Sequence, residues 1–330
     1  MQKLTVFFLF FILYFSSFSQ IGGDNTFNFV NLNTSPRAIA LGGYLHSVID
    51  ADVNNGVYNP ALINSSMLDN LSLNYTNYYA DIFYGDASYC FGLAGQNFIT
   101  SVKFIDYGQF QETNSLGDYI GSFTAGEYML SLGSSKLIDS LFHVGLNTKI
   151  AYSSMYDLNS VALFVDFGVT YAHDDRDLTA SFIVKNLGYQ VTQYYDGNRE
   201  SLPFEISVGV SNKLAHMPLR WHFTLQHIET PNLSIDNPSL TYVNNDNVIA
   251  HILRHVVLGA EFIVHKNVSL LFGYNNKTRY EMIIEDRKGL VGFSTGLSVQ
   301  IKRFSFYYSR NSHHLSGPIN TFGLITNLKK

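Results

Sequence analysis

Alternating hydrophobic and polar positions recur along most of the chain. The clearest case is 203–214, where apolar residues such as Ile206 and Val208 alternate with polar or small ones. The same alternation returns over 160–172 and 68–78. A period of two places successive side chains on opposite faces, so the pattern predicts β-strands with one wet face.

Read along the whole chain, this alternation predicts about fourteen strands, many of 10 residues or more. Strands of about 9 to 11 residues can cross a bilayer at a tilt. The predicted fold class is therefore all-β, a transmembrane outer-membrane β-barrel of about fourteen antiparallel strands with an N-terminal hatch or plug segment. The expected strands are 68–78, 81–91, 96–105, 121–133, 141–153, 160–172, 178–187, 203–213, 218–228, 253–264, 267–276, 289–300, 303–310 and 319–328.

The connections between these strands alternate in length. Short turns are expected at 92–95, 134–140, 172–177, 214–218, 265–266 and 301–302. Longer polar loops are expected at 106–120, 188–202, 229–252, 276–288 and 311–318. This alternation is typical of outer-membrane barrels and places the long loops at the cell surface and both termini in the periplasm. A soluble propeller or sandwich is the alternative.

The chain begins with the features of a secretory signal peptide. A basic Lys3 precedes an apolar stretch over 4–15, and small residues surround Phe18 before Gln20. The stretch is shorter than the roughly 20 residues of a membrane-spanning helix, which disfavours the alternative of a permanent anchor. The expected organisation is a signal peptide at 1–19, a hatch segment at 20–67 and a barrel at 68–330.

Composition narrows the function classes. Charged residues make up 14% of the chain, and its net charge is -5 without a Lys/Arg cluster, so nucleic acid is not expected as a partner. The single cysteine, Cys90, lies within a strand pattern and is expected to be a small buried residue.

Histidine and carboxylate groups predict neither a metal site nor an enzyme. The chain has 11 histidines, but no group supplies the three or four converging ligands that zinc needs. The closest groups are His251 with His255, His222 with His227, and His313 with His314. The sequence contains no Gly-x-Ser-x-Gly motif beside its acidic loop residues. We therefore expect no catalytic residue, metal or cofactor.

Ionisable residues within the strands indicate a filled lumen. Glu127, Asp166, Glu205 and Glu261 interrupt apolar strand patterns. A carboxylate facing lipid is costly, so these side chains are expected to face inward. Their expected partners are Lys103, Lys149, Lys185 or Arg254.

The hatch segment carries a motif of turn-forming residues. We single out Arg37, Gly42, Gly43, Asn59 and Pro60, because the glycines allow tight turns and Asn-Pro fixes another. Arg-Ala, Gly-Gly and Asn-Pro-Ala in this order resemble the start of fatty-acid-transporter-like outer-membrane barrels. The resemblance implies fourteen strands and an N-terminal hatch.

Further strings, at 21–27, 104–108, 202–205, 254–262 and 291–294, are similar to the PorQ family of the Bacteroidetes type IX secretion system. This resemblance implies a non-enzymatic scaffold of the attachment complex. Its barrel would hold the surface protein PorZ and, through it, act with PorU and PorV in joining secreted cargo to anionic lipopolysaccharide. The end of this chain departs from the usual pattern, because 328–330 lacks a terminal aromatic residue.

Two functional hypotheses follow. In the first, surface loops on a rigid barrel hold a partner protein, with outer-membrane lipid around the barrel. The candidate contact residues are Pro231, Leu233, Ile235, Leu240 and Tyr242. In the second, the chain transports hydrophobic small molecules through an apolar pocket in the lumen. A passive porin is a weaker option, because the hatch would obstruct it.

Overall fold

The structure is a computed structural model that describes residues 25–173, 177–195, 197–233, 248–282, 289–314 and 317–329. The expected signal peptide at 1–19 lies outside these residues. So do Ile235, Leu240 and Tyr242 of the candidate contact loop.

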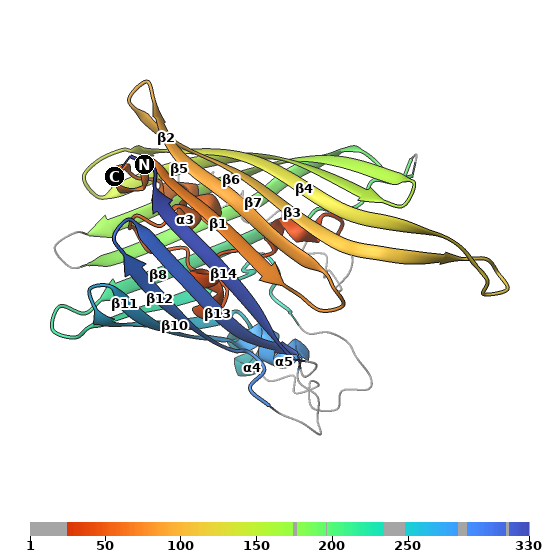
Figure 1. The fold of residues 1–330 in the computed structure, drawn as a ribbon. Helices are drawn as coiled ribbons and strands as arrows, with labels where there is room; N and C mark the ends of the chain where they lie inside the picture. The colour runs from red at the N-terminus through yellow and green to blue at the C-terminus, as the bar shows by residue number, and fades with distance from the viewer. Residues whose placement is uncertain are drawn as a thin grey trace.

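Among the described residues, fourteen antiparallel strands form one closed barrel (Figure 1). Each strand pairs with its neighbours in sequence, and β14 closes the circle by pairing with β1. This confirms the predicted fold class. The strands are β1 Asn70–Asn77, β2 Phe83–Leu93, β3 Gln96–Thr113, β4 Tyr119–Leu137, β5 Phe142–Met155, β6 Leu158–His173, β7 Leu178–Thr192, β8 Glu205–Lys213, β9 Leu219–Leu225, β10 Val256–His265, β11 Val268–Asn275, β12 Phe293–Ile301, β13 Phe304–His314 and β14 Gly317–Asn327.

Closure follows from the need to pair every backbone group in hydrocarbon. β1 and β14 align in continuous register from Asn70↔Asn327 to Asn77↔Asn320. An open edge would leave unpaired donors and acceptors at a cost of several kcal/mol each. The start of β1 and the end of β14 both lie at the short-turn end, defined as the end with the turns after β2, β4, β6, β8, β10 and β12.

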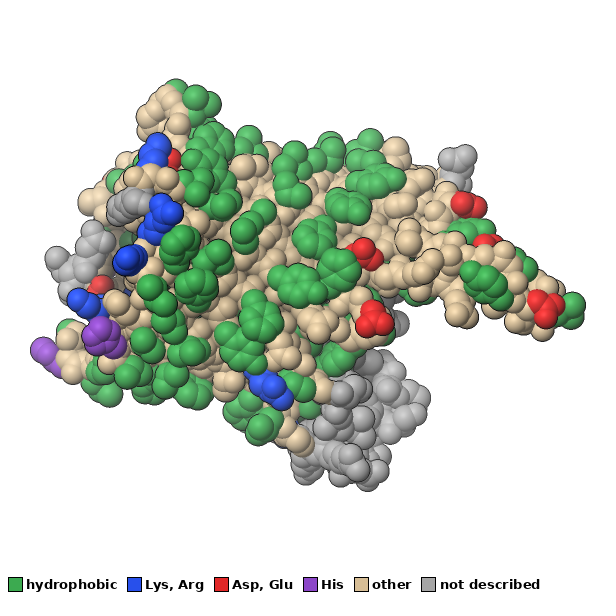
Figure 2. Space-filling model, in the orientation of Figure 1, with side chains coloured by type: hydrophobic (Ala, Val, Ile, Leu, Met, Phe, Trp, Pro, Cys, Tyr) green, Lys and Arg blue, Asp and Glu red, His purple; other side chains and the backbone are tan. Residues whose placement is uncertain are grey.

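Side-chain alternation separates a polar lumen from an apolar outer wall. In β6, Asp166 is fully buried while Leu163 and Phe167 are 49% and 41% exposed. The space-filling view shows hydrophobic side chains spread over the outside of the strands (Figure 2). An exposed apolar wall of this kind is what lipid tails solvate in transmembrane barrels.

The loop predicted at 106–120 is wrong in large part. β3 continues to Thr113 and β4 begins at Tyr119, so the two strands form a hairpin that projects past its neighbours (Figure 1). The segment is rich in polar residues, which favoured a loop. Cross-strand stacking of Phe110 on Phe123, with ring centroids 5.2 Å apart, stabilises the extended form instead.

Other long connections also contain regular structure. β7 continues to Thr192, within the loop predicted at 188–202, and β13 continues to His314. Short helices, α4 Val248–Arg254 and α5 Asn276–Met282, occupy parts of the loops expected at 229–252 and 276–288. Among the described residues, no helix is long and apolar enough to span a membrane.

Residues 25–67, here called the plug, run inside the barrel before the first strand (Figure 1). They form short helices: η1 Asn28–Asn31, α2 Pro36–Ala40, α3 Val53–Tyr58, η2 Pro60–Leu62 and η3 Ser65–Met67. Plug residues such as Ala40, Val53 and Leu62 are fully buried, and each of the three apolar clusters joins plug to wall. The lumen is therefore filled with packed protein.

Candidate functional site

Side-chain caps fix the short helices of the plug. Ser35 Oγ accepts a hydrogen bond from the Ala38 N–H at 3.3 Å and caps α2, which begins with Pro36. Asp52 Oδ1 accepts from the Asn54 N–H at 3.0 Å and caps α3. These are the residue types that satisfy the free N–H groups of a helix start. They let five- and six-residue helices persist inside the lumen.

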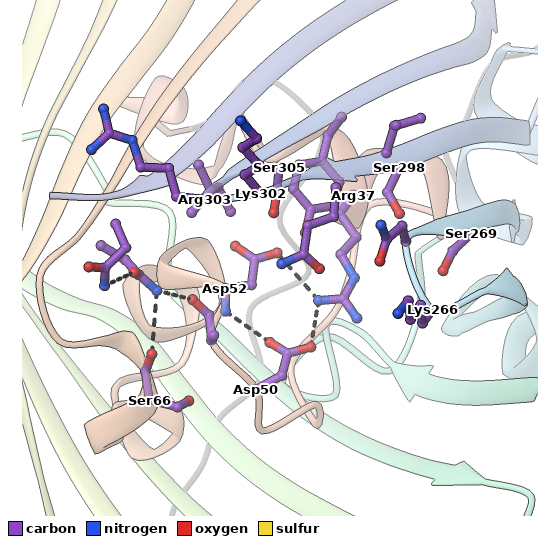
Figure 3. A pocket seen from close by; sticks show the side chains of 18 of the residues that line it. Arg37, Asp50, Asp52, Ser66, Lys266, Ser269, Ser298, Lys302, Arg303 and Ser305 are labelled. Atoms are coloured by element: carbon purple, nitrogen blue, oxygen red, sulfur yellow. Dashed lines mark hydrogen bonds and ion pairs between the residues drawn. The ribbon is translucent and has the colours of Figure 1, made fainter. Parts of the chain in front are cut away.

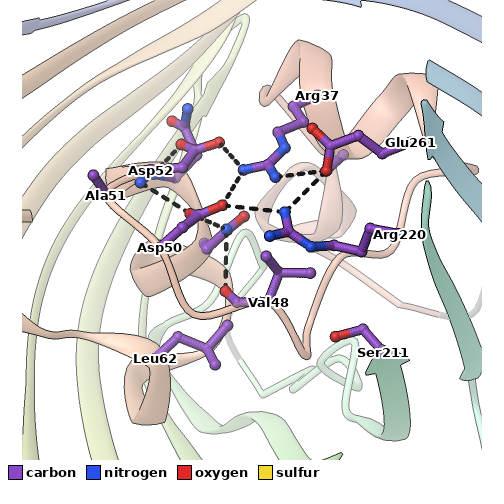
Figure 4. Close-up of polar contacts among 12 residues, drawn as sticks. Arg37, Val48, Asp50, Ala51, Asp52, Leu62, Ser211, Arg220 and Glu261 are labelled. Atoms are coloured by element: carbon purple, nitrogen blue, oxygen red, sulfur yellow. Dashed lines mark hydrogen bonds and ion pairs between the residues drawn. The ribbon is translucent and has the colours of Figure 1, made fainter. Parts of the chain in front are cut away.

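Arg37 is the centre of an ion-pair network between plug and wall (Figure 4). Its Nη1 donates to Asp50 Oδ2 at 2.6 Å and lies 3.4 Å from Asp52 Oδ2, while its Nη2 donates to Glu261 Oε2 on β10 at 2.9 Å. Arg220 of β9 also donates to Glu261 Oε2, at 3.0 Å. One guanidinium thus ties two plug carboxylates to the barrel wall.

The pKa values of the two plug carboxylates, Asp50 and Asp52, are shifted in opposite directions. Burial raises the pKa of Asp52 to about 6, against the opposing effect of Arg37 and with a further rise from Asp50. Burial acts upward on Asp50 as well, but Arg37 and Arg220 outweigh it and lower the pKa of Asp50. Asp50 is therefore the firmly ionised partner of the arginines, and Asp52 is the member that gains a proton near pH 6.

Gly42 and Gly43 form a left-handed turn where the plug meets the wall. Their φ angles are 96° and 94°, a region that favours glycine. Gly42 donates its N–H to Ser294 Oγ at 3.2 Å, and its carbonyl accepts from Asn275 Nδ2 at 3.0 Å. A Cβ at Gly273 of β11 would lie 2.1 Å from Gly42 N, so wall and plug backbones meet without a side chain between them.

Asn59 and Pro60 occupy a second close contact with the wall. Asn59 Nδ2 donates to the His46 carbonyl at 2.8 Å and to Thr170 Oγ1 of β6 at 3.2 Å. A Cβ at Gly145 would lie 2.2 Å from Pro60 C, and one at Gly168 would lie 2.3 Å from Asn59 Oδ1. Gly145 and Gly168 face each other across β5 and β6. Four residues of the predicted hatch motif thus contact the wall, whereas Gly43 bonds to Ala38 and Asn33 of the plug. The four are Arg37, Gly42, Asn59 and Pro60.

The sequence reasoning missed these wall glycines. A signal was present, because a glycine at an inward position of a strand commonly marks close approach by another backbone. Gly145, Gly168 and Gly273 all lie within clear strand patterns. Which plug residue each one meets depends on the folded barrel.

The four wall acids are all buried, as expected, and two of them pair with an expected cation. Lys149 Nζ is 2.5 Å from Asp166 Oδ2, and Lys185 Nζ is 2.8 Å from Glu205 Oε2.

Three of the expected partnerships differ. Glu261 pairs with Arg37 and Arg220 rather than with Arg254. Lys103 donates to the carbonyls of Val30 and Leu32 in the plug, at 3.2 and 2.7 Å. Glu127 accepts from Tyr107 Oη at 2.6 Å. Strand periodicity predicts which side chains face inward. It does not predict the partners that the plug supplies to them.

A polar cavity of about 440 Å³ lies at the short-turn end of the lumen (Figure 3). Arg37, Asp50 and Asp52 line its plug side, and Lys266 and Lys302 line it from the turns. Ser269, Ser298, Ser305 and Gln300 of the wall complete a mainly hydrophilic surface. Such a lining suits water or a charged group rather than a hydrocarbon.

The long-loop end of the lumen, opposite the short-turn end, is apolar and packed. Phe27, Phe29 and Val30 of the plug form a cluster with Phe164 and other wall residues. Beside it lies a cavity of about 380 Å³ whose lining includes Met155, Leu158, Tyr194 and Tyr195. Asn25 and Thr26 of the plug and Glu200 also line this cavity, so its surface is partly aromatic and apolar and partly polar.

The remaining candidate residues make no common site. His227 Nδ1 contacts Glu229 Oε1 at 3.0 Å, and His255 Nδ1 contacts the Gln226 carbonyl at 2.8 Å. Within the described ranges, no three His, Cys, Asp or Glu side chains gather as metal ligands would. Pro231 is exposed and Leu233 is half-buried at the described start of the candidate contact loop.

Comparisons with known proteins support the fold. No family model and no curated protein matches the sequence. Among solved structures, the Pseudomonas putida toluene transporter TodX matches with a TM-score of 0.50 and 10% identity, over 88% of this chain and 95% of that one. The CymD monoaromatic hydrocarbon channel matches with a TM-score of 0.54 and 9% identity, over 92% of this chain and all of that one (100%). The chain is an integral outer-membrane β-barrel that resembles hydrocarbon channels in fold.

Proposed function

We propose that this chain is a non-enzymatic scaffold of the outer membrane that holds a partner protein at its long-loop end. The observation that supports this function best is the filled lumen. Arg37 ties the plug to Glu261 of the wall, and the plug backbone packs directly on wall glycines. A packed, ion-paired interior suits a rigid frame, whereas a hydrocarbon channel needs an apolar passage.

The sequence resemblance to the PorQ family suggests the partner. On this proposal the long loops face the cell surface and hold a PorZ-like protein, which acts with PorU and PorV to process secreted cargo and attach it to anionic lipopolysaccharide. Pro231 and Leu233 are the described members of the proposed contact loop. The barrel itself performs no chemistry in this arrangement.

Transport of hydrophobic small molecules is the second candidate, and the comparisons with solved structures favour it over the scaffold. Both TodX and CymD are described as carriers of monoaromatic compounds or hydrocarbons. The cavity beside Tyr194 and Tyr195 offers an aromatic surface on which such a molecule could bind. A route from this cavity to the periplasm would require the plug to move.

One preparation tests both candidates. Tagged full-length protein is purified from native outer membranes in mild detergent, and a second sample is reconstituted into lipid vesicles. The scaffold predicts one stoichiometric surface protein in the first sample and no toluene uptake above empty vesicles in the second. Toluene uptake by a barrel that purifies alone would overturn the scaffold in favour of the transporter.

A further inference from the structure

The hairpin of β3 and β4 continues beyond the barrel wall as a two-stranded ribbon. Asp106 is the last residue of β3 that pairs with β2. Ala125 is the first residue of β4 that pairs with β5. Residues 107–124, here called the arm, therefore pair only with each other. Seven residues of β3 at about 3.3 Å each carry the arm about 20 Å past the wall.

The base of the arm is braced. Phe123 stacks on Phe110 and meets the Tyr156 ring edge-on at 5.0 Å, and Tyr156 Oη donates to Glu112 Oε1 at 2.8 Å. The turn at its tip is closed by Asn114, whose Oδ1 accepts from two backbone N–H groups. These contacts hold an isolated hairpin, otherwise marginal in water, in an extended form.

Both edges of this ribbon carry unpaired backbone groups. Natural proteins protect such edges with charged side chains, proline, β-bulges or a covering element. The arm has register shifts at Asp106/Gln109 and Glu112/Thr113, so the regular part of its β3 edge is 109–112. Residues 107–124 contain no Lys, Arg or Pro. The edge is therefore competent to accept another strand through main-chain hydrogen bonds.

The tip presents apolar side chains to solvent. Leu116 is 85% exposed, Tyr119 64% and Ile120 58%. The segment that projects from the molecule carries hydrophobic side chains on its surface (Figure 2). Exposed apolar groups beside an open edge provide the anchoring contacts that interfaces use.

Charge identifies the kind of partner. The arm has two charged side chains, Glu112 and Asp118, and both are acidic. Each also accepts a hydrogen bond, from Tyr156 Oη and Asn114 Nδ2 respectively. A second copy in the same membrane would present the same acidic edge, and anionic lipid phosphates would repel it. A segment carrying Lys or Arg complements it.

From these observations we propose that the arm is the docking element for the partner, by addition of an extended, Lys- or Arg-bearing segment of that protein to the free edge of β3. This inference rests on the proposed scaffold function and deepens it. It assigns the main contact to 107–124 rather than to the 229–252 loop. The partner segment pairs with the regular 109–112 edge, places its cations near Glu112 and Asp118, and covers Leu116 and Ile120.

Site-specific photocrosslinking in native outer membranes tests this placement. A benzophenone amino acid replaces Gln111 on the arm or, as a control, Gln96 at the start of β3, beside the short turn after β2. We expect one discrete protein adduct from position 111 and none from position 96. The crosslinked partner peptide should carry Lys or Arg, and a peptide without them, or no adduct at position 111, overturns the proposal.

Edge variants separate this inference from the scaffold function. Q111K/T113K places protective lysines on the edge, and E112Q/D118N removes the carboxylates. We expect each to lower partner retention about tenfold or more, with Q96K at the wild-type level. Heat-modifiable gel migration checks that each barrel has folded. Wild-type retention by both folded arm variants overturns the arm as docking element and leaves the scaffold standing, whereas a wild-type chain that holds no partner overturns both.

Discussion

Arg37 of the plug and Glu261 of β10 lie 224 positions apart in sequence, yet Arg37 Nη2 donates to Glu261 Oε2 at 2.9 Å. Both side chains are almost fully buried, with 5% and 8% of their side-chain surface exposed. A buried charge is tolerated where a partner of opposite sign meets it directly. This pair is therefore one of the contacts that fix the plug within the barrel.

Replacing Arg37 should loosen the plug. R37A leaves Asp50, Asp52 and Glu261 with Arg220 as the remaining cation of the network, and loss of one partner from a buried pair costs about 3 to 5 kcal/mol. We expect a lower urea midpoint, followed by fluorescence of Trp221, the single tryptophan. K277A, which removes a half-buried i,i+4 pair with Glu281 on α5, is the control and should change stability by less than about 0.5 kcal/mol.

Cys90 gives a second measure of the same change. It is the single cysteine, is fully buried, and packs on Val53, Val57 and Met67 of the plug. A displaced plug exposes this thiol, so R37A should react faster with a maleimide than the wild type does. Equal labelling rates and equal urea midpoints would show that Arg37 does not hold the plug.

The sequence predicts the barrel more fully than it predicts the contacts of the plug. Strand periodicity predicted the barrel, and the inward position of Asp166 and Glu205 followed from the same alternation. Local pattern could not place Arg37 on Glu261, because their contact depends on how the plug enters a closed barrel. The arm was missed for another reason: its polar residues resemble a loop, and its pairing rests on the contact between Phe110 and Phe123.

The network should make stability depend on pH through Asp52. Its pKa in the folded protein is raised to about 6 from an ordinary value of 3.8, so the folded state binds the proton more tightly. Protonated Asp52 therefore stabilises the folded state fully below about pH 4, and this stabilisation is lost as pH rises through about 6. About two pKa units correspond to roughly 3 kcal/mol.

The D52N variant isolates this contribution. We expect the wild type to lose stability relative to D52N between pH 4 and pH 6.5, as measured by urea unfolding at each pH. Asp50 is present in both proteins, so the difference reports Asp52 together with its interaction with Asp50. A wild-type and D52N difference that stays constant across this range would contradict the assignment.

Adding even one methyl group at a wall glycine that contacts the plug should lower the stability of the protein. A Cβ at Gly145 would lie 2.2 Å from Pro60 C, a backbone atom that cannot move without the plug. G145A should therefore cost about 1 to 3 kcal/mol and speed maleimide labelling of Cys90. G92A is the matched control, since the nearest atom to a Cβ there is 3.5 Å away. If the two variants behave alike, the close approach of Pro60 to the wall does not constrain the plug.

A buried pair in the wall allows a test by exchange of both partners. Lys185 and Glu205 join β7 to β8 at 2.8 Å, and Glu205 is fully buried. K185M leaves the carboxylate without its cation and should cost about 3 kcal/mol or more, whereas K185M/E205M removes both charges and should recover most of that loss. Urea unfolding of the single and double variants measures the difference. A double variant as unstable as K185M would mean that Lys185 contributes through packing on the Tyr44 ring, 5.1 Å from its Nζ, rather than through its charge.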